Sequence, residues 1–94
     1  INDEHDEGGL LEKRISPKEF LFSARLEIDY LNEKYEIDLP EGDYETLSGL
    51  ILDCAEHIPL RGAKVEIPGF VFTVLEGRKN RLDKIKLNLI PLKN

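Results

Sequence analysis

The closing third of the chain holds two stretches with the two-residue period of a strand: Phe70–Glu76, which is apolar on both sides, and Arg81–Ile90, which alternates apolar and polar residues. A period of two residues is typical of strands that turn one face toward a core. The polar segment Gly77–Asn80 between them predicts a turn, so we expect an antiparallel hairpin with one basic, wet face. We expect Ile85, Leu87 and Leu89 to face inward. Phe70, Phe72 and Val74 share one side of the other strand, and we expect both of its sides to be at least partly covered.

Two helices and two shorter strands are predicted before this hairpin. Lys18–Ala24 and Lys64–Ile67 alternate like strands, whereas Leu26–Tyr35 repeats its apolar residues at spacings of three and four, as one side of a helix does. The element order is therefore β-α-α-β-β-β. Strands gathered after the helices indicate an α+β fold, with two helices packed on a mainly antiparallel sheet of about four strands.

The second predicted helix begins after Gly42 and ends before Pro59. Asp43 stands where a helix N-cap is expected, because its carboxylate can accept from the free amides of the first turn. The apolar stripe of this helix also takes in Cys54, so we expect that thiol in the core. Gly49 lies inside the helix at a cost of about 1 kcal/mol relative to Ala, which predicts that another backbone passes close by at that point.

The length of 94 residues allows one domain. We expect an acidic linker or tail over residues 1–15 and the folded domain over residues 16–94. The chain starts at Ile1 and contains no Met, which suggests a piece of a longer polypeptide. No apolar run approaches the ~20 residues of a membrane span, so we expect a soluble fragment. A single cysteine forms no internal disulfide and favours a reducing compartment.

The charge is unevenly distributed along the chain. The net charge is −6, which disfavours nucleic acid as a partner because a phosphate backbone would be repelled. Residues 27–56 carry a local charge of −9, whereas residues 77–94 carry +5. The two regions therefore differ in their electrostatic character.

Two motifs point to a known family. Residues 39–51 read LPEGDYETLSGLI, and residues 58–62 read IPLRG. Together with the Phe-rich hairpin they resemble the CorC/HlyC transporter-associated domain, whose pattern has an apolar-Pro step, acids before a Tyr, Thr-Leu-Gly-Gly-Leu-Ile, and Ile-Pro with a Gly three positions on. The resemblance covers about residues 18–90. Ser48 replaces the first Gly of that pair, and Arg25 and Ala63 also depart from the usual pattern.

The resemblance implies a non-catalytic accessory domain of a bacterial hemolysin-like or magnesium and cobalt efflux protein. Such a domain would follow a membrane region and a pair of CBS domains, on the cytoplasmic side of the inner membrane. Its expected partners are those domains of the same parent chain, with a homo-oligomer left open. The fold that the family shares with a subdomain of FAD-binding oxidases gives this chain no flavin, so no cofactor is expected. The alternative is a ligand-sensing module for a nucleotide, a flavin or a divalent cation.

Three groups of residues are candidate sites. Carboxylates suited to Mg²⁺ or Ca²⁺ gather in one loop, although capping and solvation explain them more simply. Cys54 and His57 lie three apart on a helix, but a nucleophile and base need an orienting third group, and none is evident. A basic hairpin offers an interaction surface. The simpler interpretation is that its lysines are solvated and protect an edge strand against unwanted pairing with other chains. The loop carboxylates are Asp38, Glu41, Asp43 and Glu45, and the hairpin residues are Arg78, Lys79, Arg81, Lys84 and Lys86.

Overall fold

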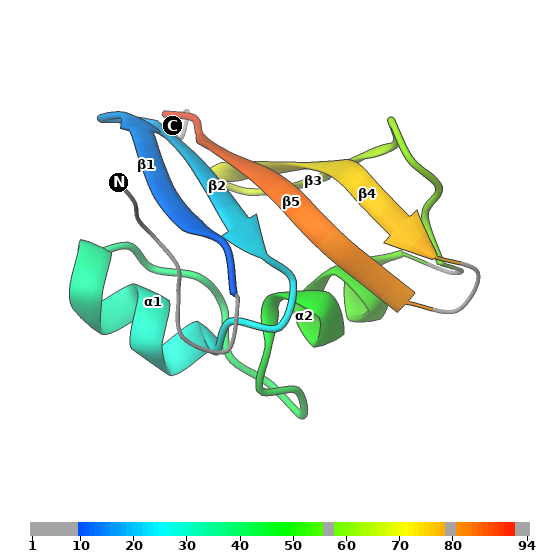
Figure 1. Cartoon of the computed structure of the whole chain (residues 1–94). Coiled ribbons are helices and arrows are strands. Elements are labelled where there is room, and N and C mark those ends of the chain that lie inside the picture. Colours follow the sequence, from blue (N-terminus) through cyan, green and yellow to red (C-terminus); the bar gives the residue numbers. More distant parts are fainter. Residues whose placement is uncertain (1–9, 56–57, 79–80, 92–94) are drawn as a thin grey trace.

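Two helices cover one face of a five-stranded antiparallel sheet (Figure 1). The computed structural model describes residues 10–55, 58–78 and 81–91. The strand order is β1-β2-β5-β4-β3, and the α+β class is confirmed. In chain order the elements are β1 Glu12–Ser16, β2 Glu19–Ser23, α1 Ile28–Tyr35, α2 Leu47–Cys54, β3 Lys64–Ile67, β4 Phe70–Arg78 and β5 Arg81–Leu89.

Strand β1 was not expected from the sequence. It lies within the predicted linker, so the sheet has five strands rather than about four, and residues 12–15 belong to the domain. Residues 1–9 of the predicted linker lie outside the described residues. The segment EKRIS lacks apolar alternation because β1 is an edge strand, exposed over most of its length and paired only with β2. Backbone pairing, such as Glu12 opposite Phe22, creates this strand without a hydrophobic signal.

The core lies between the sheet and the helices. The inward positions predicted for β5 are confirmed, since Ile85 and Leu87 are buried and Leu89 packs on the core. Strands β2 and β4 turn their Phe side chains to the same core, and the other side of β4 is half-buried. Phe20 and Phe22 stack with ring centroids 5.1 Å apart, and Tyr35 of α1 meets Phe20 edge-on. Burying a large apolar side chain stabilises the fold by about 1.5–3 kcal/mol. The largest fully buried side chains are Phe20, Phe22, Phe72, Leu31, Leu39, Leu47, Leu50, Ile51, Leu82, Ile85, Leu87 and Val74.

Helix α2 is shorter than predicted at both ends. Thr46, not Asp43, is its N-cap, and the Thr46 hydroxyl accepts from the Gly49 amide at 3.3 Å. The helix starts no earlier because Thr46 forms an antiparallel bridge with Glu27, which requires extended backbone there. Residue Ala55 is extended too, so the helix ends at Cys54 and leaves that thiol exposed instead of in the core.

Helix α1 ends in a left-handed residue, Glu36, with φ of 56°. Within α1, Asn32 fixes the loop that follows the helix by two hydrogen bonds: its Oδ1 accepts from the Leu39 amide at 2.8 Å, and its Nδ2 donates to the Leu39 carbonyl at 3.0 Å. Leu39 is thereby held in the core. Within the described residues, neither helix is long and apolar enough to cross a membrane.

The close neighbour expected at Gly49 is the side chain of Tyr44. A Cβ added at Gly49 would lie 2.5 Å from the Cβ of Tyr44. Glycine is therefore required there by the loop that packs on α2, which accounts for its cost inside the helix.

Candidate functional site

A hollow of about 390 Å³ opens where the N-terminal end of α1 meets the loop before α2. The Glu27–Thr46 bridge and the hydrogen bond from the Ile28 amide to the Glu45 carbonyl, at 2.8 Å, hold the two segments together. The hollow is strongly acidic because four of its lining side chains are carboxylates. The lining residues are Glu27, Ile28, Asp29, Glu41, Gly42, Tyr44 and Glu45.

The structure divides the predicted carboxylate group. Glu41 and Glu45 line the hollow, whereas Asp38 and Asp43 are exposed and do not. The other two acids of the hollow, Glu27 and Asp29, come from the start of α1. Within the described ranges no three His, Cys, Asp or Glu side chains are arranged to hold a metal ion.

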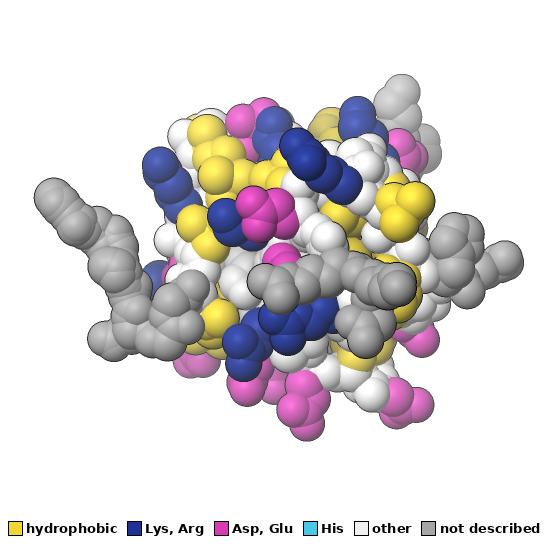
Figure 2. All heavy atoms as spheres, turned by 45° about the vertical axis from the view of Figure 1, so that its right-hand side comes forward, with side chains coloured by type: hydrophobic (Ala, Val, Ile, Leu, Met, Phe, Trp, Pro, Cys, Tyr) yellow, Lys and Arg dark blue, Asp and Glu magenta, His cyan; other side chains and the backbone are white. Residues whose placement is uncertain are grey.

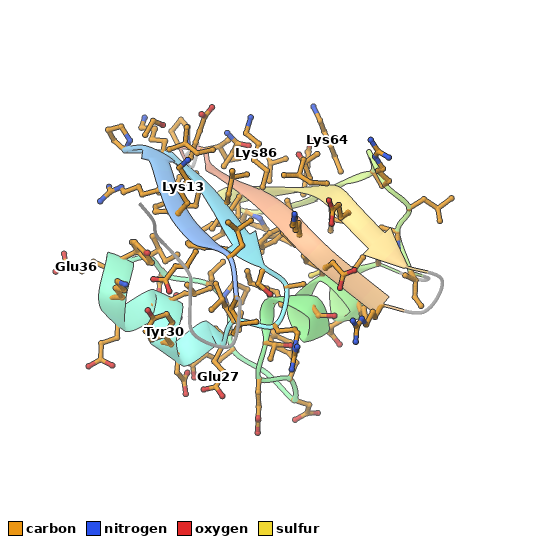
Figure 3. All side chains as sticks on the ribbon, in the orientation of Figure 1. Lys13, Glu27, Tyr30, Glu36, Lys64 and Lys86 are labelled. Carbon is orange, nitrogen blue, oxygen red and sulfur yellow. The ribbon has the colours of Figure 1, made fainter. Side chains whose placement is uncertain are left out.

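A second polar cluster, which the sequence did not reveal, ties β1 to α1. Oε2 of Glu12 accepts hydrogen bonds from Lys34 Nζ at 2.6 Å, from the Tyr35 hydroxyl at 2.7 Å and from the Tyr30 hydroxyl at 2.8 Å. The cluster was missed because its members lie 18 to 23 residues apart and come from a strand without a sequence signal. We call these four residues the Glu12 cluster; Tyr30 is labelled in Figure 3.

The cluster shifts the pKa values of its members. Burial of the Glu12 carboxyl raises its pKa, but the hydrogen bonds from Lys34, Tyr35 and Tyr30 outweigh burial and leave that pKa lowered. The hydrogen bond to Glu12 raises the pKa of Lys34. Burial, followed by the hydrogen bond to Glu12, raises the pKa of Tyr35 to about 12. All three groups therefore keep at neutral pH the protonation states that the cluster needs.

The Cys54 and His57 pair gains no support as a nucleophile and base. His57 lies outside the described residues. Burial, and next the neighbouring charge of Asp53, raise the pKa of the Cys54 thiol. A raised pKa keeps the thiol protonated, whereas the nucleophilic form is the thiolate.

The basic hairpin is split among several environments. Lys84 faces Glu76 at 3.4 Å, and Arg81 faces Asp83 at 3.4 Å, so both charges are partly neutralised. Lys86 lies on the face of the sheet that the helices leave uncovered. Lys79 and the side chain of Arg78 lie outside what the structure describes.

A five-stranded antiparallel sheet with two helices on one face, and with charged surfaces instead of a deep pocket, defines a small α+β module. The chain belongs to the family described as transporter associated domain, CorC_HlyC, whose model matches residues 13–91. The match covers nearly all the described residues and confirms the family resemblance seen in the sequence.

Two curated relatives show how such a module is used in longer proteins. Hemolysin C of Brachyspira hyodysenteriae is 31% identical over 96 residues, covering 100% of this chain and 35% of the relative. The magnesium and cobalt efflux protein CorC of Escherichia coli K12 is 24% identical over 90 residues, covering 95% of this chain and 31% of the relative. The chain thus spans about a third of the length of these relatives.

Solved structures share the fold over nearly their whole length. The CorC_HlyC domain of a Corynebacterium glutamicum hemolysin superposes with a TM-score of 0.76 at 30% identity, covering 84% of this chain and 98% of that domain. The transporter associated domain of a CBS domain protein from Porphyromonas gingivalis has a TM-score of 0.72 at 24% identity, covering 85% and 98%. The second likeness shows the fold alone.

Proposed function

We propose that this chain is a non-catalytic accessory domain of a membrane ion transporter of the magnesium and cobalt efflux or hemolysin-like type. The observation that carries the proposal is the family match over residues 13–91, shared with a relative named as an efflux protein. The packed core supports a role through surfaces, because its large side chains are fully buried and leave the polar groups outside. The domain would modulate transport by protein contact.

The proposed partners are the CBS domains and the membrane domain of the same parent chain, on the cytoplasmic side of the inner membrane, or a second copy of the chain. The description of the family as a transporter associated domain supports the first partner. The hairpin residues Arg81, Lys84 and Lys86, with Arg78 and Lys79 beside them, are the proposed contact surface. Their positive charge suits an acidic partner.

Deleting residues 13–91 from the parent protein tests this function. We expect Mg²⁺ or Co²⁺ efflux, or its regulation, to change while the amount of protein inserted in the membrane stays the same. A matched control replaces only Cys54 by Ser, because that exposed thiol has no part in the proposal. Unchanged efflux and unchanged oligomeric state after the deletion would contradict it.

The second candidate is a sensor of divalent cations at the acidic hollow. Its supporting observation is the hollow lined by Glu27, Asp29, Glu41 and Glu45. Mg²⁺ retains several of its waters when bound, so carboxylates too far apart for direct coordination can still hold the hydrated ion. Calorimetry with Mg²⁺ and Co²⁺, and with ATP and FAD for the wider ligand-sensing alternative, decides this. No heat at millimolar ligand removes the candidate.

A further inference from the structure

Among the parts of the chain that the structure describes, no element covers the face of the sheet opposite the helices (Figure 1). Both helices and the core cluster lie on the other side, so every second residue of each strand points outward into solvent. The outward residues are not uniformly polar: Leu21, Val71 and Leu75 are only partly buried there. The uncovered face therefore mixes aliphatic surface with charge.

The strand register places three lysines in one straight row across this face. Lys13 of β1 pairs with Leu21, Leu21 with Lys86, Lys86 with Thr73, and Thr73 with Lys64 of β3. One strand lies between successive lysines, so neighbouring lysines are two strand spacings, or roughly 9.6 Å, apart. We call Lys13, Lys86 and Lys64 the lysine row. Figure 3 shows them on the opposite side of the molecule from Glu27 and Glu36 of the α1 region.

The charges of the lysine row are not neutralised. Within the described residues none of its three amines takes part in a hydrogen bond or an ion pair, whereas Lys34 and Lys84 both do. Figure 2 shows acidic side chains along the lower margin of the molecule, with others at its top and centre, and basic side chains in both halves. The molecule is 24 Å across in its thinnest direction, about three Debye lengths at physiological salt. The acids on the far side of the molecule therefore screen the row only weakly.

The neighbouring rows restrict the shape of a partner. One row along the strands, Glu19 pairs with Asn88, Asn88 with Val71, and Val71 with Glu66, so two carboxylates flank the lysine row. A flat anionic surface would meet both rows and gain little. A partner that presents its acids in a single line can lie on the lysine row alone and is attracted by it. If that partner moved onto the neighbouring row that carries Glu19 and Glu66, its acids would meet these carboxylates and be repelled.

We propose that the uncovered face binds an acidic amphipathic helix of a protein partner, laid across the strands on the lysine row. Residues seven apart on a helix are about 10.5 Å apart on the same side, close to the spacing of the lysines. The helix positions three and four residues after each acid face the same way and reach Leu21 and Thr73, which lie between the lysines. In an extended segment, neighbouring side chains point to opposite sides, so many of the residues between its acids would point away from Leu21 and Thr73.

Synthetic peptides test the proposal directly. The probe is a helical 22-residue peptide with Glu at positions 4, 11 and 18 and Leu three and four residues later. Its isomer has the same composition with the acids five apart, so they leave the common side. We expect the chain to bind the heptad peptide at least about tenfold more tightly than the isomer. Binding should weaken as salt is raised.

Charge reversal on the chain provides the second arm. The triple variant K13E/K64E/K86E should lose about tenfold or more in affinity for the heptad peptide. The control K18E/R25E/R61E carries the same net charge but changes exposed residues off the row, and should bind nearly as the original chain does. Circular dichroism confirms that both variants fold. Equal loss in both variants, or equal binding of the two peptides, would overturn the proposal.

Two other occupants are outcomes of the same experiments. Row-dependent sedimentation with vesicles containing phosphatidylserine, without preference for the heptad peptide, would assign the face to lipid instead. Row-dependent self-association in the ultracentrifuge would assign it to a second copy. The proposal rests on the proposed function of the domain as a module that acts by protein contact. If deletion of the domain alters efflux control but the chain does not bind the heptad peptide, that function stands and the acidic helix is refuted as the partner.

Discussion

Replacing Glu12 by Ala tests whether the Glu12 cluster, and not backbone pairing alone, holds β1 in the fold. The change removes two hydrogen bonds from tyrosine hydroxyls, each contributing about 1 kcal/mol net at this partly buried carboxylate. The ion pair with Lys34 adds only about 0.5 kcal/mol, since the Lys34 side chain is 51% exposed while that of Glu12 is 19% exposed. The free energy of unfolding should therefore fall by about 2 kcal/mol.

Thermal unfolding followed by circular dichroism measures this loss. For a domain of this size about 2 kcal/mol corresponds to a decrease in Tm of roughly 8–16 °C. Glu12→Gln, which keeps one acceptor oxygen, should lose about half as much. The matched control is Glu33→Ala on the exposed side of α1, which should change stability by less than about 0.5 kcal/mol. A Glu12→Ala variant as stable as that control would refute the reasoning.

Three further predictions concern the same fold. Folding lowers the pKa of Glu12, so the stabilisation from this carboxylate is present above its unfolded pKa and is lost as pH falls through its folded pKa. The difference in free energy of unfolding between the original chain and Glu12→Ala, measured by urea unfolding, should therefore shrink below about pH 4. Gly49→Ala should destabilise by about 1–3 kcal/mol despite better helix propensity, because its Cβ meets that of Tyr44, and Tyr44→Gly should remove the clash in the double variant. Asn32→Ala should cost about 2 kcal/mol by freeing both backbone groups of Leu39, and Asn32→Asp should cost less because it keeps the acceptor; equal losses in the two variants would contradict this.

The parts of the fold that follow from periodicity were predicted well. Strands β2 to β5 could be predicted because their residues follow the two-residue period of a strand, and the core side of β5 because Ile85 and Leu87 alternate with polar residues. The start of α2 could not be predicted in this way, because it is set by the bridge between Glu27 and Thr46, two residues in segments far apart in the chain. Helix propensity carries no information about such a tertiary constraint.

The candidate sites were harder to predict, for a related reason. Sequence proximity suggested that Asp38 and Asp43 join Glu41, but the loop turns them outward, and the acids that do line the hollow come from α1. The lysine row depends on strand register, since Lys13 and Lys64 are 51 positions apart in the chain. Only Lys86 of the row belongs to the hairpin surface that the sequence predicts. Surfaces assembled across strands leave no local pattern.

The position of Glu12 has a mechanical consequence. Residues Glu12 and Phe22 form the first rung of the β1–β2 ladder, at the open end of that hairpin, where peeling of the edge strand would begin. A pull on any polypeptide joined ahead of Leu10 would be applied to this rung. The tyrosine and lysine bonds to Glu12 reinforce the rung that would break first, so tension from a preceding domain would pass into α1 before it could unzip the sheet.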